Sequence, residues 1–219
     1  MTAPFVPKPA PPLPTGHDLL ADRSVLVTAA AGTGIGFATA KRCAEEGARV
    51  MLSDLHPGRL ERFADELSRE IGRTVPFQVC DVRSNDQVAR LMDAADEALG
   101  GVDVLVNNAG LGMTKPLIET REEEWQSVLD VNLSGTFRTL RAALPRMQER
   151  GRGVIVTVSS ICAWRAEAGP SAYAASKAGV LALTRCAALE AAGSGVRINA
   201  VVPSLAIHPH LEKVSSPEF

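Results

Sequence analysis

Residues 24–42 read SVLVTAAAGTGIGFATAKR and contain the strongest fold signal of the sequence. A short β-rich run is followed by a turn that contains Gly32, Gly34 and Gly36, and then by residues of helical character. Glycines in such a turn let the backbone approach a phosphate closely, and the following helix N-terminus offers free N–H groups to an anion. A tight turn that only packs a helix on a sheet explains a glycine cluster equally well.

The rest of the chain repeats the alternation of short apolar runs and longer helical segments. This alternation predicts a parallel sheet, and strands of near-continuous apolar character are expected to be covered on both faces. The sequence therefore predicts an α/β fold with a Rossmann-type, doubly wound parallel sheet in a single domain, residues 23–219. Six strands are expected, at residues 25–27, 50–52, 77–79, 102–106, 154–158 and 196–202.

Length and composition limit the classes of partner. A chain of 219 residues suits one α/β domain, which must then hold both a cofactor and a substrate. With 46% hydrophobic residues and a net charge of -2, neither nucleic acid nor a membrane is an expected partner, whereas a small molecule is. The four cysteines form no CxxC pair, and no apolar run is long enough for a membrane span, so a cytoplasmic protein is expected.

The first 22 residues differ from the rest in composition. Their proline density favours extended chain over helix or strand, so we expect residues 1–22 to form a tail outside the core. Two helix starts carry capping-box signatures, Ser84 with Gln87 and Thr120 with Glu123.

An acidic residue stands where a ribose-binding carboxylate would be needed. Asp54 ends the expected second strand, about 20 residues past the glycine turn. A carboxylate there would bind the ribose hydroxyls of NAD and repel the 2′-phosphate of NADP, although Arg59 nearby would offset part of that repulsion. A solvated acid at a strand end is the alternative, but the spacing favours the ribose role.

The single tyrosine of the chain, Tyr173, precedes Lys177 by four residues. In a helix this spacing puts both side chains on one face. A phenol ionises near pH 10, and an ammonium group close by is expected to lower that pKa enough for acid–base catalysis at neutral pH. A surface pair without function is the alternative.

Together, the glycine turn, Asn107–Gly110, Ser159-Ser160 and Tyr173-x-x-x-Lys177 resemble the short-chain dehydrogenase/reductase family from about residue 24 to 204. The resemblance implies that Tyr173, Lys177 and Ser160 are catalytic, with Ser160 polarising the substrate oxygen, and that Asn132 holds a proton-relay water. It also implies that Asn108 ties the central strands together and that Asp81 and Val82 contact the adenine. The remaining expected cofactor contacts are Gly32, Thr33, Gly34, Ile35, Asp54 and Gly110, and also Tyr173 and Lys177 themselves.

The sequence departs from the family pattern in three places. Alanines occupy the first glycine region, and Thr28 lies one residue further from Gly34 than the family's Thr-Gly-x-x-x-Gly-x-Gly allows, so the turn is expected to be rerouted. After Pro203 the family's glycine and threonine are replaced by Ser204-Leu205-Ala206. The chain ends at Phe219, so the family's seventh strand is expected to be missing. His208 and His210 lack a third clustered ligand, and no metal is expected.

The combined expectation is an NAD-dependent enzyme that interconverts a secondary alcohol and a ketone. Apolar residues after Ser160 and Pro203 indicate an apolar substrate, and the resemblance suggests a 3-hydroxyacyl thioester or a hydroxysteroid. A non-catalytic NAD-binding regulatory or scaffold protein is the alternative. Two long helices, about 121–148 and 171–191, resemble the family's dimer-forming pair and suggest a homo-oligomer, dimer or tetramer. The candidate outward residues on these helices are Trp125, Phe137, Leu181 and Leu183.

Overall fold

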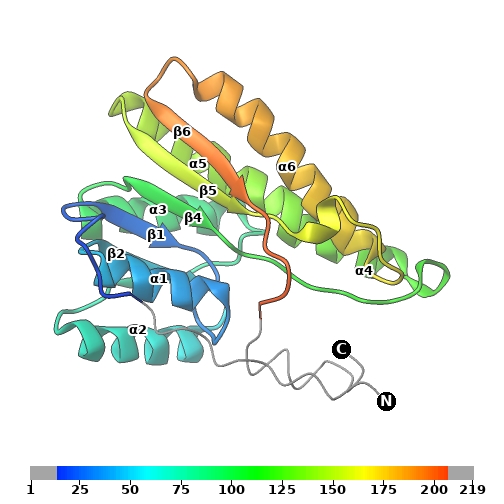
Figure 1. Ribbon diagram of the computed structural model, residues 1–219, viewed down its shortest axis with the longest axis horizontal. Coiled ribbons are helices and arrows are strands. Elements are labelled where there is room, and N and C mark those ends of the chain that lie inside the picture. The colour runs from blue at the N-terminus through cyan, green and yellow to red at the C-terminus, as the bar shows by residue number, and fades with distance from the viewer. Residues whose placement is uncertain (1–13, 207–219) are drawn as a thin grey trace.

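The computed structural model describes residues 14–206, and their six strands form one parallel sheet (Figure 1). The strand order is β3-β2-β1-β4-β5-β6, so the direction of winding reverses between β1 and β4. This is the predicted Rossmann-type sheet, and ligands of such sheets bind at the carboxyl ends of the strands beside the reversal point. The strands are β1 (Ser24–Val27), β2 (Arg49–Asp54), β3 (Phe77–Val79), β4 (Val104–Asn107), β5 (Gly153–Val158) and β6 (Val196–Val201).

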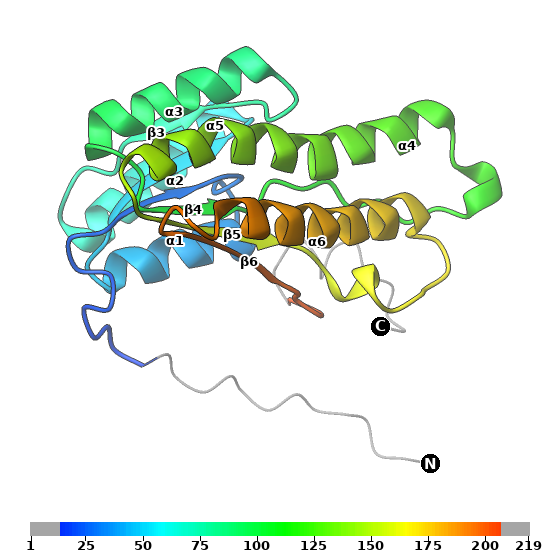
Figure 2. The ribbon, with the colours of Figure 1, turned by 90° about the horizontal axis from the view of Figure 1, so that it is seen from above.

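Helices cover the two faces of the sheet unequally. α1 (Ile35–Glu45) and α2 (Pro57–Ile71) lie on one face, whereas α3 (Asn85–Leu99), α5 (Gly135–Glu149) and α6 (Ser171–Ala191) lie on the other (Figure 2). α4 (Glu122–Leu129) continues into α5 through a π-helical turn, Asp130–Ser134. Two short 3₁₀ turns, Leu117–Glu119 and Ile161–Ala163, follow β4 and β5.

Alternate residues of each strand enter different apolar layers, because successive side chains of a strand point to opposite faces. Leu26 of β1 and Met51 of β2 pack in the layer under α3 and α5, together with Leu105 and Ile155. Val25 and Val27 pack in the other layer, under α1 and α2. The near-continuous apolar strands noted in the sequence are thus explained by burial on both faces.

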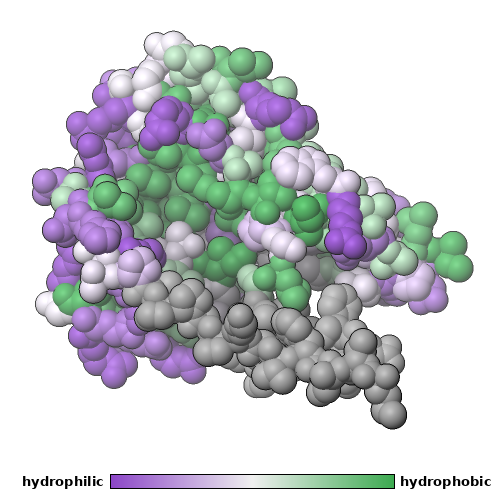
Figure 3. Space-filling view, viewed as in Figure 1, coloured by the Kyte–Doolittle hydropathy of each residue, from purple (hydrophilic) through white to green (hydrophobic). Residues whose placement is uncertain are grey.

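One part of the α1 face has no helix above it among residues 14–206. Val154 and Val156 of β5 are only half-buried there, and Val201 of β6 is exposed. Figure 3, viewed as Figure 1, shows a hydrophobic area over these two strands.

The described part of the N-terminal segment packs on the domain. The backbone N–H groups of His17 and Leu19 donate to the Glu46 carboxylate at 2.8 and 3.2 Å, and Arg42 pairs with the same carboxylate. These two hydrogen bonds lower the pKa of Glu46, and the bond from the His17 N–H has the larger effect. Leu20 packs against the apolar layer under α1. Packing therefore begins before the expected boundary at residue 23, while residues 1–13 lie outside the described part.

The two helix starts agree with the sequence to different degrees. The Ser84 hydroxyl accepts from the Gln87 N–H at 3.3 Å, so the N-cap half of the expected capping box is confirmed. The reciprocal half is wrong, because the Ser84 N–H donates to the Asp81 carbonyl and the Gln87 side chain accepts from the Asp81 N–H. The cap expected at Thr120 is wrong by one residue, because α4 begins at Glu122 and the Arg121 N–H donates to Glu124 instead. The Thr120 hydroxyl donates to the Pro116 carbonyl.

The residues proposed to face a partner copy are mostly not on the surface. Leu181 is 7% exposed and belongs to the core, so its proposed outward position is wrong. Leu183 packs partly against the layer under α5, and Trp125 is half-buried. Phe137 alone of the four is exposed, with the Arg141 guanidinium 5.2 Å from its ring centroid.

No helix within the described range is both long and apolar enough to cross a lipid bilayer. Between residues 14 and 206, no three His, Cys, Asp or Glu side chains lie close enough together to hold a metal ion. His208 and His210 lie outside the described residues.

Candidate active site

The glycine turn connects β1 to α1 beside the reversal point of the sheet. Ala29 occupies the place of the family's first glycine and has a positive φ of 49°. An L-residue pays about 1–2 kcal/mol for this conformation. Ala29 thus adopts the positive φ that alanine was expected to avoid by rerouting the turn, so the turn is strained at this residue.

Two close contacts hold the turn in place. The Asn108 side-chain amide donates to the Thr28 and Ala29 carbonyls, both at 3.1 Å, and its backbone N–H donates to the Thr28 hydroxyl at 2.9 Å. Asn108 thus ties β4 to β1, the role implied by the family resemblance. A Cβ added to Gly36 would lie 2.3 Å from the Ala29 carbonyl oxygen, so only glycine allows α1 to approach the turn so closely.

A cavity of about 290 Å³ opens at the carboxyl ends of β1, β2 and β3. Asp54 lies in its wall and is buried, and its carboxylate accepts from the N–H groups of Ala31 at 3.1 Å and His56 at 3.0 Å. Arg59 lies 3.3 Å from the same carboxylate, so the partial charge compensation expected from Arg59 is present as an ion pair. Asp81, Val82 and Gly110 also line the cavity.

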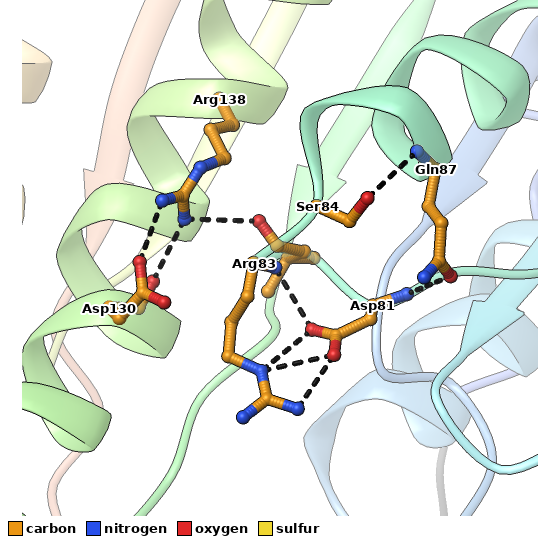
Figure 4. Close-up of polar contacts among 7 residues, drawn as sticks. Asp81, Arg83, Ser84, Gln87, Asp130 and Arg138 are labelled. Atoms are coloured by element: carbon orange, nitrogen blue, oxygen red, sulfur yellow. Dashed lines mark hydrogen bonds and ion pairs between the residues drawn. The ribbon is translucent and has the colours of Figure 1, made fainter.

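The loop after β3 carries the second carboxylate of this cavity. Arg83 donates to both oxygens of Asp81, with Nη2 2.7 Å from Oδ2 (Figure 4). This pairing lowers the pKa of Asp81. Both acidic residues of the cavity are thus paired with an arginine that follows them in sequence.

A second cavity, of about 460 Å³, shares Ala29 and Gly110 with the first and extends toward α6. Its lining includes Gly34 and Ile35 of the turn, together with Ser160, Tyr173, Lys177, Pro203 and Leu205. Gly32 and Thr33, expected at the cofactor, line neither cavity. A Cβ added to Gly34 would meet nothing within 4 Å, so the turn leaves open space beside the N-terminus of α1. The adjoining cavities and this open turn fit an elongated dinucleotide.

Three of the four predicted catalytic residues, Ser160, Tyr173 and Lys177, meet in the second cavity, whereas Asn132 does not line it. Tyr173 and Lys177 lie on the first turns of α6, and the Lys177 Nζ is 5.6 Å from the centroid of the Tyr173 ring. Ser160 comes from the end of β5, and its hydroxyl accepts from the Cys162 N–H at 3.3 Å. Residues 13 positions apart in sequence, Ser160 and Tyr173, thus share one cavity wall.

Burial shifts both ionisable groups toward their neutral forms. It raises the pKa of the Tyr173 phenol, with contact to Ser160 acting in the opposite direction. Burial also lowers the pKa of Lys177 to about 8. The expected lowering of the Tyr173 pKa by Lys177 is wrong for this arrangement, because the ammonium group donates to the Val158 carbonyl at 2.8 Å and lies over the ring face.

Asn132 lies in the π-helical turn and is fully buried. Its side chain donates to the Leu111 carbonyl at 3.0 Å and to the Ser176 hydroxyl at 2.9 Å, and accepts from the Leu111 N–H at 2.6 Å. Protein groups therefore use both donors and the acceptor. In this structure the side chain of Asn132 positions the loop after β4 against α6.

Sequence reasoning missed Ser176, which connects Asn132 to the catalytic helix. The Ser176 hydroxyl donates to the Tyr173 carbonyl at 2.7 Å while it accepts from Asn132. Its spacing of three residues from Tyr173 on a helix was an available signal. Its partner Asn132 lies 44 residues away, so only the folded chain shows the connection.

Comparison with known proteins adds the family context. The family model described as short chain dehydrogenase matches residues 23–217. A Mycobacterium tuberculosis protein is 53% identical over 96% of this chain and 80% of its own length; its name is (5R,7aS)-5-hydroxy-7a-methyl-1-oxo-2,3,5,6,7,7a-hexahydro-1H-indene-carboxyl-CoA reductase. Cis-4-hydroxycyclohexanecarboxylate dehydrogenase of Sinomonas cyclohexanicum is 42% identical over 88% of this chain and 76% of its own.

Among solved structures, a short chain dehydrogenase from Mycobacterium smegmatis superposes with a TM-score of 0.87 at 50% identity. The superposition covers 90% of this chain and 83% of that one.

Proposed function

Because this chain belongs to the short-chain dehydrogenase/reductase family, we propose that it interconverts a secondary ring alcohol and the corresponding ketone with NAD as cofactor. The observation that carries this proposal is the meeting of Ser160, Tyr173 and Lys177 in the wall of one cavity. A buried phenol beside a serine hydroxyl suits proton transfer to or from a substrate oxygen. The open glycine turn borders the same cavity.

The substrate class is inferred from the relatives and from exposed apolar side chains on the segments that follow Ser160 and Pro203. The two named relatives carry ring systems and a carboxyl-derived group in their names. In this chain Trp164 is 71% exposed on the loop after β5, and Leu205 is 60% exposed at the mouth of the second cavity. Such exposed apolar side chains suit an apolar ring. The proposed substrate is an alicyclic hydroxy or oxo compound whose carboxyl group is carried as a thioester. It shares the thioester with one of the two classes expected from the sequence, the 3-hydroxyacyl thioesters, and the ring with the other, the hydroxysteroids.

Bound NAD supplies the acceptor or donor of the hydride. In the direction of reduction, the Tyr173 hydroxyl gives its proton to the substrate carbonyl oxygen, and the Ser160 hydroxyl donates a hydrogen bond to the same oxygen. Lys177 lines the same cavity, with its Nζ 5.6 Å from the centroid of the Tyr173 ring, and its proposed role is a contact to the bound cofactor. Asn132 and Ser176 hold the catalytic helix against the loop after β4.

The raised pKa of Tyr173 favours reduction at neutral pH, because the phenol is then protonated and ready to donate. Oxidation needs the deprotonated phenol and should become faster as the pH rises. We therefore expect opposite pH dependences for the two directions, measured at saturating cofactor. Oxidation that is fully active at neutral pH and flat above it would contradict this assignment.

The NAD preference rests on Asp54, whose buried carboxylate faces the first cavity. A 2′-phosphate placed beside it would be repelled, with the Arg59 ion pair reducing that repulsion. Either NAD or NADP could serve the chemistry, so the two are compared directly in the test.

Absorbance of the reduced nicotinamide, followed with alicyclic oxo-acyl thioesters, 3-oxoacyl thioesters and oxosteroids, tests the proposal. We expect turnover of an alicyclic thioester by the parent protein and the loss of most of it in Tyr173→Phe. Binding of NAD without turnover of any member of this panel would instead favour a regulatory or scaffold protein.

A further inference from the structure

The loop that carries Asp81 and Val82 begins at the outermost strand of the sheet. β3 has only three residues and pairs with β2 alone among the described strands. The loop therefore has a strand neighbour on one side only. Its position depends on contacts made by side chains.

Contacts within the loop fix its local shape (Figure 4). The Asp81 N–H donates to the Gln87 side chain at 3.0 Å, and the Ser84 N–H donates to the Asp81 carbonyl at 3.0 Å. The Arg83 backbone N–H also donates to the Asp81 carboxylate, at 2.9 Å. These bonds link the loop to the start of α3 but leave its other side free.

Arg138 of α5 supplies the contact on that other side. Its Nη1 donates to the Val82 carbonyl at 3.4 Å and to the Asp130 carbonyl at 3.3 Å, and its Nη2 lies 2.7 Å from the Asp130 carboxylate. The side chain of Arg138 is only 18% exposed. One guanidinium thus joins the loop after β3 to the first residue of the π-helical turn.

Packing at the same point brings the loop close to the helix. A Cβ added to Gly135 would lie 2.7 Å from a methyl group of Val82, so the valine rests directly on the helix backbone. The Gly135 N–H donates to the Asp130 carbonyl, which closes the π-helical turn. Arg138 therefore stabilises the contact between Val82 of the loop and the π-helical turn.

We propose that Arg138 is a positioning residue for the adenosine half of the cofactor. It sets the distance between the Asp81-Val82 loop and the long helix, and thereby the width of the first cavity. This inference rests on the proposed function, because it takes Asp81 and Val82 to be adenosine contacts. Arginine suits the role because its planar group can reach several acceptors at once, whereas lysine offers a single point charge.

Isothermal titration with ADP-ribose measures the proposed effect without turnover. Arg138→Gln should weaken ADP-ribose binding at least about fivefold, because hydrogen bonds to a charged donor are lost from the loop. Arg141→Gln is the matched control: it removes the same charge from the same helix, where Arg141 bonds Asn85 and not the cavity loop. The control should bind ADP-ribose like the parent.

Kinetics separate positioning from general damage. Arg138→Gln should raise the KM for NAD while kcat at saturating NAD stays near the parent value, because the catalytic groups on α6 are untouched. Arg138→Lys keeps the positive charge but loses the planar guanidinium group. Its KM for NAD should lie between those of the parent and Arg138→Gln. This variant also serves if Arg138→Gln fails to fold.

The outcomes are distinct. An ADP-ribose affinity equal to the parent's in the folded Arg138 variants would overturn the inference. An equal loss of ADP-ribose affinity in Arg141→Gln would also overturn it. A parent protein that binds no ADP-ribose would instead overturn the proposed function on which the inference depends.

Discussion

The ammonium group of Lys177 is buried and donates one hydrogen bond to the protein, to the Val158 carbonyl. Its pKa of about 8, compared with the ordinary 10.5, corresponds to a cost of about 3 kcal/mol for holding the charge in the folded protein. Below pH 8 Lys177 is charged in both the folded and the unfolded protein, so the full cost of burying the charge lowers the stability of the fold. Between these two pKa values the folded state binds fewer protons than the unfolded state, so stability rises with pH.

Lys177→Met should therefore stabilise the fold at neutral pH. Removing the charge removes the cost of burying it, whereas losing the hydrogen bond to Val158 destabilises the fold by a smaller amount. The net gain in stability is about 1–2 kcal/mol. Urea unfolding at neutral pH measures the gain, which should shrink as the pH approaches 10. The same variant should lose most turnover. A variant less stable than the parent at neutral pH would show that the burial cost is overstated.

Tyr173→Phe should abolish most turnover and leave the fold and NAD affinity intact. Phenylalanine keeps the ring, and no other tyrosine exists in the chain to replace the hydroxyl. General acid–base catalysis contributes about 10²–10⁴-fold, which sets the size of the loss. Steady-state rates with NAD titration measure both quantities. Near-normal rates would mean that Tyr173 is not the acid.

Asp54→Ala should narrow the preference for NAD over NADP. The substitution removes a ribose hydrogen-bond acceptor and a charge that repels the 2′-phosphate. It also leaves Arg59 without its partner and available to a phosphate. The ratio of kcat/KM for the two cofactors measures the change. An unchanged ratio would show that Asp54 does not contact the cofactor.

At the scale of elements, the approach of α1 to β1 depends on one glycine. Gly36→Ala would push its methyl group into the Ala29 carbonyl, at 2.3 Å, and into the Asn108 amide, at 2.6 Å. Overpacking of this kind costs about 1–3 kcal/mol, and it would move the turn away from the cavity, so NAD affinity should fall as well. Thermal unfolding and NAD titration measure the two effects.

Gly32→Ala provides the control on the same turn. A Cβ there meets nothing within 4 Å, and this glycine does not have a positive φ. Its stability should match the parent within about 0.5 kcal/mol. A stability loss equal to that of Gly36→Ala would show that the turn is sensitive to any side chain, and not to the close approach at Gly36.

At the scale of the whole molecule, the surface still carries apolar residues that a monomer would expose. Phe137 on α5 is 45% exposed and Leu189 on α6 is 80% exposed, and Val201 of β6 is 45% exposed. We expect self-association through the long helices, because exposed apolar area of this kind commonly marks an interface. Light scattering at micromolar concentration tests this, and Phe137→Glu should shift the equilibrium toward monomer. A monomeric parent protein would contradict the prediction.

The sheet, the order of its elements and the catalytic helix could all be predicted from the sequence. Strand and helix periods are local properties, so the six strands and the extent of α6 followed from nearby residues. The spacing of Tyr173 and Lys177 also placed both on one helix face.

The protonation and contacts of those residues could not be predicted in this way, because their surroundings come from distant parts of the chain. Lys177 donates to Val158, 19 residues away, and burial raises the pKa of Tyr173 where sequence alone suggested a lower value. Leu181 turned inward because α6 packs on the sheet through a face that its weakly amphipathic sequence does not identify. Charge, burial and contact direction are thus set by what packs around a residue, which a local pattern does not contain.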